Sequence, residues 1–191
     1  MEPSESHELT QAEQFDALIE RSLLMQDGWI EYNLPFPKSV FLNHVVSRGF
    51  LLHGSGNADV IEFEPRQAND SEKEFGNKIA VYAVNDPILP IFYAIQDREQ
   101  LSGQINSGKY VDDETGEAKY HFAVEASALE KYPWKDGVVY ITPPDGFEEG
   151  KNNEGELMGE FANETPVQAK LKLRVSPEDF PYLDSVKPIL G

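Results

Sequence analysis

The chain has 191 residues, of which 40% are apolar and 11% aromatic, and its 34 acidic residues outnumber 16 basic ones to give a net charge of −18. This composition is typical of a globular chain long enough to bury a core, and it excludes an intrinsically disordered protein. The absence of cysteine excludes disulfides and thiolate zinc sites, and the negative charge disfavours general binding to nucleic acid.

The N-terminal part of the chain predicts two helices. Residues 1–8 are polar and unpatterned, which predicts disorder. Thr10 begins the capping-box pattern TQAE, and apolar residues then follow at helical spacing until Gly28. A second helix is predicted over 39–49, with Ser39 as its cap.

The remainder reads mostly as strands. Apolar runs or alternating patterns predict strands at 50–53, 79–84, 120–125, 137–143 and 168–175. Because helices come first and strands later, without a strand–helix–strand rhythm, we expect one α+β domain over 1–191 with mostly antiparallel strands.

Three other segments complete the prediction. Asp86 followed by proline predicts the start of a helix over 87–98. Residues 100–118 are polar and Gly-rich, which indicates a surface hairpin. Residues 144–160 are acidic and rich in Gly and Asn, so we expect a mobile loop there.

Four polar features stand out along the chain: the stretch FLLHGSG at 50–56, which contains His53, then Tyr82, Tyr93 and Glu160. Each has a plain structural explanation when taken alone. The histidine is a polar strand end, the tyrosines are core aromatics, and the glutamate is one charge of an acidic segment.

Taken in order, these features resemble the ADP-ribosyltransferase superfamily, in the His-Tyr-Glu branch that includes poly(ADP-ribose) polymerases and diphtheria-type toxins. The resemblance covers about 50–175. Its three motifs are a strand ending in His-Gly-Ser, a strand with a central tyrosine followed eleven residues later by a second tyrosine, and a glutamate that enters a strand, followed by a turn and a strand rich in Leu, Val and Lys. They fall on Leu52-His53-Gly54-Ser55, on Ala80-Val81-Tyr82-Ala83 with Tyr93, and on Glu160-Phe161.

The resemblance implies two packed, mostly antiparallel sheets with N-terminal helices and a cleft for NAD between the sheets. It implies cleavage of the nicotinamide–ribose bond, by an ADP-ribosyltransferase or an NAD glycohydrolase. Gly54 would expose backbone to the carboxamide, with Ser55 as a further contact, and Tyr82 and Tyr93 would sandwich the nicotinamide. His53 would donate to a ribose hydroxyl, and Glu160 would stabilise positive charge in the transition state.

Basic residues and departures from the family pattern complete this picture. Arg66 and Arg98 are the candidates for pyrophosphate contacts, with Lys78 as a weaker third. Pro90 stands where the polymerases carry a serine that bonds the carboxamide. Two further acidic residues flank the glutamate motif at intervals of four, so the assignment of Glu160 has alternatives in Glu156 and Glu164.

Other functions remain open at this point. An inactive module that binds NAD or ADP-ribose, or an interaction module on the same fold, is the main alternative, and a tRNA 2′-phosphotransferase fits an anionic chain poorly. We expect no metal, because the four histidines show no ligand spacing. The acceptor is unknown, and the charge favours a protein or small molecule over nucleic acid. We expect a cytoplasmic protein with no membrane contact, because no apolar run approaches ~20 residues.

Overall fold

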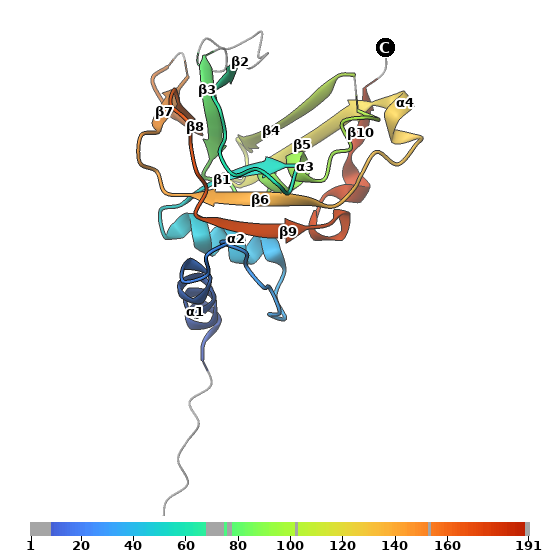
Figure 1. Cartoon of the computed structure of the whole chain (residues 1–191). Helices are drawn as coiled ribbons and strands as arrows, with labels where there is room; N and C mark the ends of the chain where they lie inside the picture. Colours follow the sequence, from blue (N-terminus) through green and yellow to red (C-terminus); the bar gives the residue numbers. More distant parts are fainter. Residues whose placement is uncertain (1–8, 68–74, 76–77, 102, 153, 190–191) are drawn as a thin grey trace, which may run out of the picture.

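The computed structural model describes residues 9–67, 75, 78–101, 103–152 and 154–189, and it has an α+β fold with two mostly antiparallel sheets (Figure 1). The expected α+β class is therefore confirmed. The disorder expected for 1–8 lies outside the described residues. In the described part of the chain, no helix has the length and apolar character needed to cross a membrane.

The larger sheet has the strand order β7-β8-β3-β1-β6-β9, with β2 paired to β3 beside this path. All its ladders are antiparallel. Its strands, in chain order, are β1 (Leu51–Ser55), β2 (Arg66–Gln67), β3 (Ile79–Val84), β6 (Gly137–Thr142), β7 (Glu148–Lys151), β8 (Leu157–Asn163) and β9 (Leu171–Val175).

The smaller sheet has the order β10-β5-β4. It contains β4 (Ile105–Val111), β5 (Ala118–Glu125) and β10 (Lys187–Ile189), and its pair β10–β5 is parallel. The hairpin expected within 100–118 is thus present, with β4 as its first strand.

Several α-helices and short 3₁₀ helices in the described part of the chain accompany the sheets. They are α1 (Gln11–Leu23), α2 (Lys38–Ser47), α3 (Leu89–Ala94), α4 (Ala126–Leu129), η2 (Pro177–Asp179) and η3 (Leu183–Ser185). In the view of Figure 1, α2 lies beneath β6 and β9, and α1 lies beneath α2. The main core joins apolar side chains of these helices to β1, β5, β6 and β9.

The larger sheet divides at β3, and this division positions the candidate site. One edge of β3 pairs with β1 at Val84 and with β2 at Ala80 and Ile79. In the described ladders, β1 beyond Leu52 continues with β6 alone. Figure 1 accordingly shows β3 and β8 running steeply away from the direction of β1, β6 and β9. On this edge of β3, Val84 pairs with β1 and Ala80 pairs with β2. We call the stretch between these two positions the fork.

Two helix predictions need correction. The second helix does not start from Ser39, because Pro37 already supplies the extended backbone before the first helical residue and has no side-chain cap bond. The helix expected over 87–98 is the shorter α3, because the chain beyond it turns to bridge Trp134 through Gln96. The capping box of Thr10 is present as predicted.

The acidic segment 144–160 is also more ordered in secondary structure than a loop. It contains β7 and the first half of β8, which pair with each other. The Gly and Asn residues serve the turn between these strands, where Asn152 accepts backbone hydrogen bonds from Glu154 and Glu156, and Gly155 has a φ of 84°. A glycine favours such a left-handed turn because it has no Cβ.

Candidate functional site

The imidazole of His53 lies in the fork, where it replaces a missing strand partner. Its Nδ1 lies 2.6 Å from the carbonyl oxygen of Tyr82, the residue midway between the β1 and β2 pairing positions. Since a carbonyl oxygen only accepts, Nδ1 carries the proton and donates it. In the described part of the chain, Nε2 has no hydrogen-bond partner.

The protonation of His53 follows from its surroundings. Burial lowers the pKa of the imidazole below its usual value, the bond to Tyr82 opposes this effect, and the positive charge of Arg66 adds a smaller lowering. The ring is therefore neutral near pH 7, with a bare lone pair on Nε2. This atom would accept a hydrogen bond from a ligand hydroxyl, rather than donate one as the resemblance implied.

Gly54 has a structural reason to lack a side chain. A Cβ at this position would lie 2.0 Å from the carbonyl oxygen of Pro90 and 3.0 Å from the amide nitrogen of Ala94. The glycine thus lets α3 pack directly on β1. Ser55, the next residue, accepts a hydrogen bond from the amide of Asn57 at 3.1 Å and so shapes the turn after β1.

The two candidate tyrosines have different neighbours. The hydroxyl of Tyr82 lies 2.9 Å from the carbonyl oxygen of Phe75 and 3.0 Å from that of Lys78, which share its single proton, and its ring meets that of Phe75 edge-on. Tyr93 has its hydroxyl 2.7 Å from that of Ser107 on β4, and its ring neighbour is Phe92. The structure does not stack the two tyrosines on each other, and no face-to-face sandwich of them is present among the described residues.

Glu160 is the acidic residue nearest the fork by register. It lies opposite Val84, which in turn pairs with Leu52 of β1. With strands spaced by about 5 Å, its Cα is roughly 10 Å from that of Leu52. Of the two alternatives, Glu156 bonds Asn152 in the hairpin turn, and Glu164 lies 3.5 Å from the ammonium of Lys78. Neither of them faces the fork in the ladder.

Alternation along the strands divides the candidates between two faces. The register places Tyr82, Glu160 and Arg66 on one face of the sheet around β3. The side chain of His53 belongs to the other face, where it lines a small cavity with Val81 and Ala83. The side chains expected to bind one ligand therefore lie on both faces of the sheet around the fork. They do not line one continuous surface.

The three candidate cations also differ in position. Arg66 pairs with Ala80 at the mouth of the fork and is close enough to influence His53. Lys78 forms ion pairs with Glu148 and Glu164. Arg98 is exposed in the turn after α3, at the opposite end of the helix from its start beside the fork.

Sequence reasoning missed two aromatic residues of this site. Phe63 stacks near His53 with ring centroids 4.5 Å apart, and Tyr140 meets Phe63 edge-on at 4.9 Å. Tyr140 lies within an apolar stretch that predicts a buried strand, so no signal in the sequence singled it out. Phe63 had a weak signal, because it is the one apolar side chain between two glutamates in the extended stretch IEFEP.

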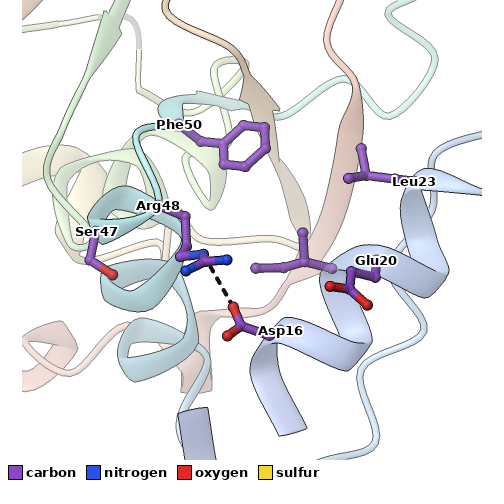
Figure 2. A pocket seen from close by; sticks show the side chains of 7 residues that line it. Asp16, Glu20, Leu23, Ser47, Arg48 and Phe50 are labelled. Carbon is purple, nitrogen blue, oxygen red and sulfur yellow. Dashed lines mark ion pairs between the residues drawn. The ribbon is translucent and has the colours of Figure 1, made fainter. Parts of the chain in front are cut away.

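A larger, open pocket lies away from the fork, between α1 and α2 (Figure 2). Its volume is about 410 Å³. Arg48 and Asp16, which Figure 2 joins by a dashed line, form an ion pair of 3.3 Å across it. None of the predicted site residues lines this pocket, and its carboxylates and apolar side chains do not form a catalytic arrangement.

No group of three or more potential metal ligands is present among the described residues. Comparisons with protein-family models, with curated proteins and with solved structures gave no match to this chain. The resemblance to ADP-ribosyltransferases therefore depends on the quoted sequence motifs alone.

Proposed function

We propose that this chain binds NAD at the fork and cleaves its nicotinamide–ribose bond, as an ADP-ribosyltransferase or an NAD glycohydrolase. The observation that carries the proposal is the state of His53. Its Nδ1 is engaged by Tyr82, its ring is neutral, and its Nε2 is left at the point where β1 loses β3 as a partner. A fixed acceptor beside an interrupted ladder suits a ligand that presents hydroxyl and carboxamide groups.

In this proposal, the reaction breaks the bond between C1′ of the ribose and the ring nitrogen of nicotinamide. The bonding electrons leave with nicotinamide, and the positive charge develops on the ribose. The carboxylate of Glu160 stabilises this charge, and His53 accepts a hydrogen bond from a ribose hydroxyl. Water or an acceptor group then bonds to C1′ and releases a proton. Fixed charges directed at a developing charge supply a large share of catalysis, about 3–4 kcal/mol for one donor in other enzymes.

Arg66 supports the proposal from the mouth of the fork. A guanidinium remains charged at all physiological pH values and matches phosphate oxygens in geometry. The chain is otherwise strongly anionic, with a net charge of −18. A local cation is therefore needed to hold a pyrophosphate, and an acceptor that is a protein or a small molecule suits the surface better than nucleic acid.

A module that binds NAD or ADP-ribose without turnover is the second candidate. It is favoured by the separate surroundings of Tyr82 and Tyr93, whose rings contact Phe75 and Phe92 respectively and not each other among the described residues. It is also favoured by Pro90, whose carbonyl fills the space beside Gly54.

Release of nicotinamide from NAD, followed by proton NMR, tests the proposal. The native protein should release nicotinamide, and Glu160→Gln should reduce the rate by two orders of magnitude or more. Glu164→Gln is the matched control, because Glu164 is paired with Lys78 and its loss should leave the rate unchanged. Native protein that binds NAD without release supports the second candidate. Equal losses in both variants would contradict the role of Glu160.

A further inference from the structure

The imidazole of His53 lies against an aromatic ring, that of Phe63. The centroids of the His53 and Phe63 rings are 4.5 Å apart, with their planes inclined by 55°. Phe63 also meets Tyr140 edge-on, at 4.9 Å and 86°. Tyr140 is the direct partner of His53 in the β1–β6 ladder, so the three rings form one cluster on this face of the sheet.

The backbone of Phe63 is fixed independently of its ring. Phe63 and Val167 exchange two hydrogen bonds, of 2.8 and 2.9 Å, in an isolated antiparallel bridge. The neighbours Glu62 and Glu64 are exposed, whereas the side chain of Phe63 is partly buried. The ring is therefore the apolar anchor of a segment that otherwise faces solvent.

Tyr140 holds the other end of the same segment. Its hydroxyl donates to the carbonyl oxygen of Asn57 at 2.8 Å and accepts from the amide of Val60 at 3.2 Å. The connection from β1 to β2 is thus attached to the sheet at both of its ends. These contacts fix the backbone position from which the ring of Phe63 reaches His53.

The space beside these rings is small. The cavity lined by His53, Phe63 and Tyr140 has a volume of about 10 Å³, at the lower limit for one water molecule. The only fixed hydrogen-bond acceptor that the described residues offer to the ring is the carbonyl oxygen of Tyr82.

We propose that Phe63 is a positioning residue, whose ring holds the imidazole of His53 in the one orientation that directs Nδ1 to Tyr82 and leaves Nε2 for a ligand. Phe63 acts through His53 and does not touch the ligand itself. The identity of that ligand as NAD rests on the proposed function, whereas the orientation of the ring is a property of the free protein.

The test compares Phe63→Leu with Phe147→Leu by NMR of histidine ring nitrogens. Phe147 lines the same cavity, and its ring makes no stacking contact with His53 among the described residues, so its loss controls for altered packing. In the native protein and in the control, His53 should carry its proton on Nδ1 across the neutral pH range. In Phe63→Leu, the Nε2-protonated tautomer should become populated, and the pKa should rise toward the ordinary 6.5.

A second readout is affinity for NAD, measured by calorimetry. Loss of one well-placed neutral hydrogen bond should raise Kd about three- to tenfold in Phe63→Leu and leave it unchanged in Phe147→Leu. If Phe63→Leu does not fold, Phe63→Met keeps a flexible apolar side chain without the ring and serves the same comparison.

The two readouts separate the two ideas. A change of tautomer in Phe63→Leu supports the positioning role even if the native protein fails to bind NAD. Failure to bind NAD would overturn only the assignment of NAD as the ligand. A folded Phe63→Leu or Phe63→Met variant with the native tautomer and pKa overturns the positioning role, whatever its affinity for NAD.

Discussion

Nδ1 of His53 donates to the carbonyl oxygen of Tyr82 across a distance of 2.6 Å, at the point where the ladder between their strands ends. A side chain thus satisfies a backbone acceptor that strand pairing leaves open, as buried polar groups require. The bond also selects one tautomer, so that a single nitrogen, Nε2, is presented to a ligand.

Replacing Gly54 by alanine should destabilise the protein. The added Cβ would lie 2.0 Å from the carbonyl oxygen of Pro90, so α3 must shift on β1. We expect a loss of about 1–3 kcal/mol in the free energy of unfolding, measured by urea denaturation. Gly56→Ala is the control, because its Cβ meets no atom closer than 3.4 Å and should cost less than the first variant. Equal stability of the two variants would show that α3 does not pack on Gly54.

Asp86 should be the main polar attachment of α3. One carboxylate oxygen accepts from the amides of Ile88 and Leu89, and the other accepts from the hydroxyl of Tyr120 and from Lys109. Asp86→Ala should lower the free energy of unfolding by about 2–4 kcal/mol, through loss of the cap and of the partner of a partly buried hydroxyl.

Tyr120→Phe is the companion measurement for Asp86. It removes the hydroxyl together with its need for a partner and should cost only about 1 kcal/mol in urea denaturation. The double variant should be more stable than the sum of the two single losses predicts, because no hydroxyl is then left unpaired. Strict additivity would contradict the coupling between α3 and the smaller sheet.

Stability should fall on acidification because of His53. Its folded pKa is lowered by burial, whereas the unfolded chain has the ordinary 6.5, so the unfolded chain binds more protons between these two values. The contribution is therefore fully present above pH 6.5 and is lost as the pH falls toward the folded pKa. Melting temperatures measured from pH 7.5 to 4.5 should show this slope, and His53→Gln should flatten it. If the dependence of melting temperature on pH is unchanged in His53→Gln, another titrating group causes it.

Arg66 and Arg98 should differ in their effect on NAD. Arg66 lies beside the fork, and Arg98 lies in the exposed turn after α3. Loss of a charged hydrogen bond in Arg66→Gln should weaken binding about tenfold, measured by calorimetry, while Arg98→Gln should bind as the native protein does. If Arg98→Gln weakens NAD binding and Arg66→Gln does not, the pyrophosphate binds near the end of α3 and not beside the fork.

Local signals in the sequence predicted much of the fold. The strand 79–84 is present with the predicted ends, and the capping box of Thr10 forms, because both depend on neighbouring residues. The pairing of β7 with β8 was not predicted, since their glutamates and glycines carry no strand pattern and the pairing is decided by the turn at Asn152.

The candidate site was predictable only in part. The motifs named His53 and Glu160 as candidates, and the register connects their strands through Val84 of β3. The reason for Gly54 lies in Pro90, thirty-six residues away, which no local pattern reveals. Phe63 escaped notice for the same reason, because its partners are set by the fold of the connection between β1 and β2.

The most direct test of NAD binding at the fork is a titration of the native protein with NAD, followed through the backbone amide resonances. The proposal predicts that the largest shifts occur at His53 to Ser55, with further shifts at Tyr82 and Glu160, and that His53→Gln reduces them all. The absence of shifts at millimolar NAD, or shifts confined to the pocket between α1 and α2, would contradict it.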